Sequence, residues 1–119
     1  MSASISTLPE KDRPISEQYR IVAKLYVDAD AAASLLEELK TTTLEKQKQD
    51  LINREGDMPD SHAERRVKAG DDWPEYIKQM VAARTKANRL KCQLEFIRMQ
   101  FTEHQDANAS ARAEMRLSR

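Results

Sequence analysis

The chain has few of the residues that interrupt or cross-link a fold. Its 119 residues include two glycines, four prolines, one cysteine, one tryptophan, three tyrosines and two phenylalanines. The single cysteine, Cys92, excludes an internal disulfide framework and a cysteine metal cluster, and it indicates a reducing compartment such as the cytoplasm. The scarcity of glycine and proline permits long, uninterrupted helices.

The sequence also lacks long apolar runs and an excess of charge of one sign. No stretch reaches the roughly 18 apolar residues that a membrane-spanning helix needs, so no contact with a membrane is expected. Residues 1–20 hold no basic start followed by an apolar run, and we therefore expect no secretory signal. The formal net charge is 0, whereas a strongly basic chain would have indicated nucleic-acid binding.

The chain is instead rich in charged residues and in residues with straight side chains. Charged residues make up 34% of the chain, and such a composition is typical of long helices and coiled coils, because straight side chains lose little rotamer freedom in a helix. The 39% of hydrophobic residues suits a narrow seam between helices better than a thick core. We therefore expect an all-α fold, a long antiparallel helical hairpin with a short connecting helix.

Helix-breaking residues divide the chain into an arm and one domain. Residues 1–15, punctuated by Pro9 and Pro14, are expected to form a flexible N-terminal arm. Residues 16–119 are expected to form a single helical hairpin domain. Its predicted helices span residues 16–54, 61–69 and 72–117.

Capping patterns support these boundaries. Ser16 is the expected N-cap of the first helix, since its hydroxyl can accept a free backbone N–H of the first turn. Ser61 and Glu64 have the spacing of a capping box for the short helix. Asp72 and Glu75 repeat that spacing at the start of the last helix. Glycines at 56 and 70 should end the first two helices.

Mainly apolar residues recur in alternating steps of three and four along both long helices, with a few polar residues at the same spacing. In the first helix they are Val22, Leu25, Ala29, Ala32, Leu36, Leu39 and Thr43. In the last helix they are Trp73, Tyr76, Met80, Ala83, Ala87, Leu90, Leu94, Ile97, Phe101, His104, Asn108, Ala111 and Met115. A seven-residue repeat of this length indicates left-handed supercoiling against another helix.

The distribution of charge favours antiparallel pairing of the two helices. The first helix carries an acidic set, which comprises Asp28, Asp30, Glu37 and Glu38. The last helix carries a basic set, which comprises Arg84, Lys86, Arg89, Lys91 and Arg98. A fold-back near residues 56–70 would bring the two sets alongside each other, although each exposed pair contributes at most about 1 kcal/mol.

Two helices with one seam supply little core for a stable domain. We therefore expect a homodimer that forms a four-helix bundle. The predicted self-association seam comprises Leu90, Leu94, Ile97, Phe101, His104 and Asn108. Polar residues at seam positions, here His104 and Asn108, commonly set the register or the oligomeric state.

Two surfaces are candidates for contact with other molecules. The acidic set, with Trp73 and Tyr76, is a candidate protein-binding surface. The aromatic pair is either an exposed anchor, since Trp and Tyr carry interface energy well, or a pin that holds the short helix to the hairpin. The basic set is a candidate nucleic-acid contact with Phe96 and Phe101 nearby for stacking, unless the acidic set neutralises it. The C-terminal arginines, Arg112, Arg116 and Arg119, are a further candidate for phosphate or an acidic protein.

No pattern of residues indicates catalysis or metal binding. The chain has no HExxH motif, glycine-rich phosphate loop or nucleophile elbow. His62 is interpreted as an exposed loop residue, and Cys92 has no neighbouring base to activate its thiol. We therefore expect a protein that is not an enzyme and that uses no cofactor or metal.

Two segments carry a resemblance to known proteins. The stretch QYRIVAKLYVDADAAASLLEELK (18–40) and the stretch from Ala87 to Leu117, which ends in RAEMRL, resemble the two halves of small helical accessory proteins of tailed bacteriophages. This resemblance implies a phage product that acts in the cytoplasm of the host bacterium. It carries no catalytic residues.

These observations give one leading hypothesis and two alternatives. The leading hypothesis is a protein-interaction module that binds and inhibits or modulates a host nuclease or defence complex, with the acidic set mimicking phosphate. The first alternative is a nucleic-acid-binding accessory of phage recombination or replication. The second alternative is an assembly scaffold or chaperone.

Overall fold

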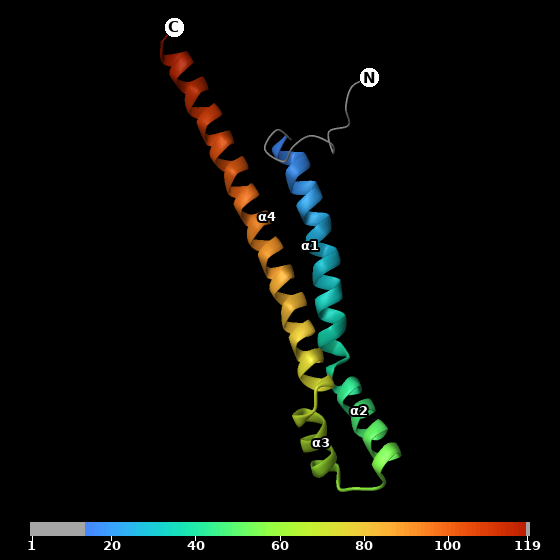
Figure 1. Cartoon of the computed structure of the whole chain (residues 1–119). Helices are drawn as coiled ribbons and strands as arrows, with labels where there is room; N and C mark the ends of the chain where they lie inside the picture. The colour runs from blue at the N-terminus through green and yellow to red at the C-terminus, as the bar shows by residue number, and fades with distance from the viewer. Residues whose placement is uncertain (1–13, 119) are drawn as a thin grey trace, which may run out of the picture. The chain divides into compact units, whose positions relative to one another are not determined.

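The computed structural model describes residues 14–118, which form four helices and, over this range, no β-strand (Figure 1). The helices are α1 (Ile15–Glu38), α2 (Lys40–Glu55), α3 (Asp60–Ala69) and α4 (Asp72–Leu117). The predicted all-α helical hairpin is thus confirmed. The predicted N-terminal arm, 1–15, lies outside the described residues except for Pro14 and Ile15.

The described residues form two compact units. The first unit combines α1 up to Val27 with α4 from Asn88 onward. The second unit comprises residues 28–87, and so contains the end of α1, both short helices and the start of α4.

In the second unit α1 and α4 run antiparallel. Asp30 of α1 contacts Arg84 of α4, and Leu36, further along α1, contacts Tyr76, which lies earlier in α4. The order of contacts is therefore reversed between the two helices, as the distribution of charge predicts.

The first long helix is interrupted at Leu39, where the sequence predicts one continuous helix over 16–54. The hydroxyl of Tyr76 donates a hydrogen bond to the carbonyl of Leu36, which in an uninterrupted helix would accept the N–H of Lys40. A side chain inserted into the helical ladder is a recognised cause of a kink. The prediction is wrong here because the inserted residue comes from α4, distant in the sequence.

Proline, and not serine, precedes the first turns of α1 and α3. The carbonyl of Pro14 accepts the N–H groups of Glu17 and Gln18, each at 3.0 Å. Ser16 therefore lies inside the first turn of α1, and the predicted serine cap is wrong.

The start of α3 differs from the prediction in the same way. Pro59 occupies the N-cap position with φ −58°, and no side chain caps this helix end. The capping box predicted for Ser61 and Glu64 is therefore not formed. Because the ring of Pro59 fixes its φ, the helix begins at Asp60, before Ser61 can take the N-cap position. The last helix begins at Asp72, so Asp72 also lies one residue too late to be its cap.

The short helices α2 and α3 form a small hairpin within the second unit (Figure 1). Gly56 ends α2 with φ 98°, a left-handed conformation that glycine adopts without steric penalty. Leu51 of α2 and Ala63 of α3 are buried. Ion pairs join the two helices, from Lys48 to Asp60 at 2.8 Å and from Arg66 to Glu55 at 2.8 Å.

The buried face of α1 differs from the predicted seam by one residue at alternate positions. Leu25 and Ala32 are exposed, whereas their neighbours Tyr26 and Ala33 are half-buried and fully buried. The inward pattern on α1 is thus Val22, Tyr26, Ala29, Ala33 and Leu36. Apolar residues stand side by side at 25–26 and 32–33, so the sequence holds two overlapping three-four patterns and does not choose between them.

Candidate interaction surfaces

Arg84 forms a cluster of polar contacts with α1 inside the second unit. Its Nε and Nη2 donate hydrogen bonds to the two carboxylate oxygens of Glu37, at 2.9 and 2.7 Å. Its Nη1 donates to Asp30 Oδ1 at 2.7 Å, and Nη2 also reaches Ser34 Oγ at 3.3 Å. The two-pronged contact with Glu37 fixes the planar guanidinium in one orientation.

The electrostatics of this cluster favour its charged state. The hydrogen bond from Arg84 holds the pKa of Glu37 below its ordinary value. The hydrogen bonds to Glu37 and then Asp30 raise the pKa of Arg84. Both shifts favour the ionised Glu37–Arg84 pair. We call this cluster the Arg84 clasp (Arg84, Asp30, Ser34 and Glu37).

The Arg84 clasp divides the predicted acidic set into two pairs. Asp30 and Glu37 are engaged by Arg84, so their charges are already compensated inside the chain. Asp28 and Glu38 are exposed, and their side chains make no ion pair or hydrogen bond within residues 14–118. Within the predicted acidic set, Asp28 and Glu38 are therefore the two members whose carboxylates no cation of the described residues compensates.

The predicted basic set divides similarly. Arg84 belongs to the clasp, and Arg98 forms a hydrogen bond with Tyr19 that raises the pKa of its guanidinium. Lys86, Arg89 and Lys91 are exposed and have no acidic partner in the described part of the chain. These three side chains are the available part of the predicted nucleic-acid contact.

The aromatic pair lies largely inside the second unit. Trp73 is 7% exposed, and its ring stacks on that of Tyr76 with centroids 5.7 Å apart and an interplanar angle of 19°. Tyr76 is half-buried and donates its hydroxyl to the carbonyl of Leu36. Because the indole of Trp73 is buried, the aromatic pair fits the interpretation in which it holds the short helix to the hairpin better than the interpretation in which it is an exposed binding anchor.

Lys48 is a buried cation whose burial no pattern in the sequence indicates. Its side chain is 6% exposed, and its Nζ pairs with Glu45 Oε1 at 2.9 Å and with Asp60 Oδ1 at 2.8 Å. The hydrogen bonds to Asp60 and Glu45 raise the pKa of Lys48. The stretch KQKQD (46–50) reads as a solvated face, because the burial of Lys48 depends on α3 folding back over α2.

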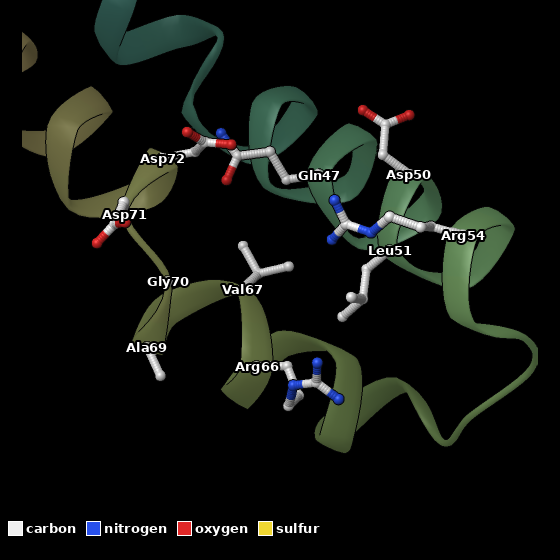
Figure 2. Close-up of a pocket in the computed structure, with 10 residues that line it drawn as sticks. All are labelled: Gln47, Asp50, Leu51, Arg54, Arg66, Val67, Ala69, Gly70, Asp71 and Asp72. Carbon is white, nitrogen blue, oxygen red and sulfur yellow. The ribbon is translucent and has the colours of Figure 1, made fainter.

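A groove of about 560 Å³ lies between α2, α3 and the start of α4 (Figure 2). In Figure 2 the side chains of Leu51 and Val67 point into the space between α2 and α3, and the guanidinium of Arg54 lies over it. The groove is lined by Gln47, Asp50, Leu51, Arg54, Arg66, Val67, Ala69, Gly70, Asp71 and Asp72. Acidic and basic groups both border the apolar floor of the groove. The lining therefore favours neither an anionic nor a cationic ligand.

A smaller, mainly apolar hollow of about 290 Å³ lies in the first unit, between the start of α1 and α4. It is lined by Ile15, Ser16, Tyr19, Ile97, Arg98 and Phe101.

The predicted self-association seam on α4 is used partly within the chain. Ile97 is buried, and Leu90 and Leu94 are half-buried. Phe101, His104 and Asn108 are exposed. His104 and Asn108 contact each other through Nε2 and Nδ2 at 3.3 Å, one helical turn apart.

The described residues offer neither a metal-binding cluster nor a membrane-spanning helix. Within the described residues, no group of three or more His, Cys, Asp or Glu side chains is arranged to hold a metal ion. None of the helices over residues 14–118 has the length and apolarity needed to cross a membrane. Cys92 and His62 are both exposed.

No protein-family model matches the chain, and no significant similarity to a curated protein or to a solved structure is found.

Proposed function

We propose that the protein is a non-enzymatic helical interaction module that also associates with itself as a homodimer. The observation that carries this proposal is the placement of its apolar side chains. Among the described residues, four of the eight buried apolar residues are alanines, and no large side chain is fully buried. Over residues 14–118, eleven large apolar side chains are exposed, among them Leu25, Leu35 and Phe96. A chain with this surplus of exposed apolar surface gains by burying it against another protein surface.

The proposed partner is a protein with a basic, phosphate-binding surface. Asp28 and Glu38 support this choice, because their exposed carboxylates lack a cation within the described residues. Carboxylates held on a helix can take the place of nucleic-acid phosphates against arginine and lysine side chains. A host nuclease or defence complex presents such a surface, and the resemblance to phage accessory proteins supplies the setting, the bacterial cytoplasm.

Affinity capture from a bacterial lysate tests this proposal. The immobilised chain should retain a protein in stoichiometric amount, and an excess of duplex DNA should release it, because the DNA competes for the same basic surface. The double variant Asp28→Asn/Glu38→Gln should lose the captured protein. Asp106→Asn, which removes an exposed acid elsewhere, should retain it. Failure to capture a stoichiometric protein, or capture that DNA does not disturb, would contradict the proposal.

A nucleic-acid accessory function is the second candidate. The observation in its favour is that Lys86, Arg89 and Lys91 are exposed without acidic partners in the described residues. In a gel-shift assay, duplex or single-stranded DNA should bind with an affinity that falls steeply with salt. Replacing the three cations by glutamine should weaken binding. Replacing Arg84, whose guanidinium is already bound by Glu37 and Asp30, should leave DNA binding unchanged. Absence of a shift at low salt would eliminate this candidate.

A further inference from the structure

The helix α1 carries a second three-four pattern beside its buried face. It comprises Ile21, Leu25, Asp28, Ala32 and Leu35 of α1 and Leu39 at the break that follows α1, and we call it the outer stripe. Leu25, Leu35 and Leu39 are 51%, 56% and 42% exposed, and Ala32 is also exposed. Asp28 is its one charged member. A repeat of this spacing is what a helix presents to a second helix that packs alongside it.

The other sides of this helix are already occupied or polar. Val22, Ala29 and Ala33 point inward and are buried. In the second unit, the Arg84 clasp covers the flank that carries Asp30 and Glu37. The outer stripe lies on the opposite flank, where no ion pair within residues 28–87 covers it.

We propose that the outer stripe is the self-association surface, and that its occupant is the outer stripe of a second copy of the chain in antiparallel orientation. This inference rests on the homodimer of the proposed function and assigns the contact surface. It replaces the α4 seam in that role, because Ile97 is already buried within the chain.

The spacing of the stripe fixes one register. In an antiparallel coiled coil, each layer joins the two kinds of seam position, one from each helix. Leu25 then meets Leu35 of the second copy, and Ile21 meets Leu39. The two central layers each place Asp28 against Ala32, whose small side chain leaves space for the carboxylate. Every member of the stripe has a counterpart, so the pattern is complementary to itself.

The charges beside the stripe select the same register. Lys24 precedes Leu25, and Glu38 precedes Leu39, so both lie along one edge of the stripe. When Leu25 meets Leu35 in the antiparallel arrangement, Lys24 faces Glu38 of the second copy, and symmetry repeats the pair. Both side chains are exposed and unpaired within the described residues. A parallel arrangement would instead bring like charges to the same level.

Sedimentation equilibrium of the full chain at several concentrations tests the contact surface. Leu35→Lys should weaken the dimer at least about 100-fold, since symmetry places the substitution at two buried contacts. The matched control is Val27→Lys. Val27 is an equally apolar residue of α1, 62% exposed but off the stripe, and its substitution should leave the dissociation constant unchanged. Circular dichroism confirms that each variant remains helical.

Further variants give results that misfolding cannot imitate. Asp28→Ala should tighten the dimer about tenfold, because it removes a carboxylate that loses water in the contact. Lys24→Glu and Glu38→Lys should each weaken the dimer roughly fivefold. Their combination should restore it, because the exchanged charges again face each other.

The possible outcomes separate this inference from the proposed function. A dimer that responds to all these variants as described supports the surface and the register. A dimer that is indifferent to Leu35→Lys and Asp28→Ala overturns the outer stripe but leaves self-association intact. A wild-type chain that remains monomeric at every concentration overturns both.

Discussion

At the scale of single residues, the Arg84 clasp connects the charge pattern of the sequence to the geometry of the fold. The sequence places an acidic segment opposite a basic one, and the structure concentrates this complementarity in one arginine with two carboxylates. Because Glu37 accepts two hydrogen bonds from the guanidinium, protonation of its carboxyl group weakens a two-bond contact between α1 and α4 in the second unit.

The clasp makes stability depend on pH in the acid range. Arg84 holds the pKa of Glu37 below its ordinary value of 4.5. The stabilising contribution of the Glu37–Arg84 contact is therefore present above pH 4.5. It is lost as the pH falls through the lower pKa that Glu37 has in the folded state. The Tm of the wild type should fall more on acidification than the Tm of Arg84→Gln. Arg112→Gln, an exposed control, should follow the wild type, and parallel curves for wild type and Arg84→Gln would refute the clasp.

Adjacent alanines on α1 offer a direct test of which three-four pattern is buried. Ala33 is fully buried and Ala32 is exposed. Ala33→Leu should lower the free energy of unfolding by about 1–3 kcal/mol, because the added atoms overpack the helix interface. Ala32→Leu should have little effect on the folded monomer. Because Ala32 also lies in the proposed dimer contact, both variants are compared at a protein concentration at which the chain is monomeric. Urea denaturation measures both, and the reverse order would show that the predicted seam was the buried one after all.

At the scale of secondary-structure elements, the break at Leu39 depends on a hydroxyl group from α4. Tyr76→Phe removes the donor to the Leu36 carbonyl while retaining the stacking ring beside Trp73. The freed carbonyl can then accept the N–H of Lys40, as in an uninterrupted helix. The amide of Lys40 should consequently exchange its hydrogen more slowly.

Amide exchange followed by NMR measures this effect. Tyr26→Phe serves as the control, since it removes a hydroxyl from α1 without touching the break. Unchanged exchange at Lys40 in Tyr76→Phe would show that the break has another origin.

The elements also show how far the sequence alone can lead. Helical composition, glycines at 56 and 70 and the long repeat in α4 are local signals, and they predict the helices within a few residues. The serine caps were wrong because prolines immediately upstream fix the first turns. The break at Leu39 and the burial of Lys48 could not be predicted, because both depend on side chains from helices that approach only in the folded chain.

The candidate surfaces were predictable only in part, for a related reason. Sequence identifies Asp28, Asp30, Glu37 and Glu38 as one acidic set, but it cannot tell which of them an arginine engages. Likewise, two overlapping apolar patterns on α1 are visible in the sequence. Packing against α4 decides which one turns inward, and so which one remains for a partner.

At the scale of the whole molecule, folding and association should be linked. If the folded chain dimerises and the unfolded chain does not, mass action makes Tm rise with protein concentration. Differential scanning fluorimetry over a hundredfold range of concentration should show this rise for the wild type and a smaller one for Leu35→Lys. A Tm independent of concentration would argue against the homodimer.

The position of Asp28 and Glu38 beside Leu25 and Leu35 has a consequence for dosage. A basic partner that binds these carboxylates must displace the second copy of the chain. The monomer would then be the form that binds the partner, and the dimer would be an inactive store of monomers. When a monomer binds the partner, mass action would cause further dimers to dissociate. Under the proposed inhibitory function, the effect of the chain would then level off as its expression rises.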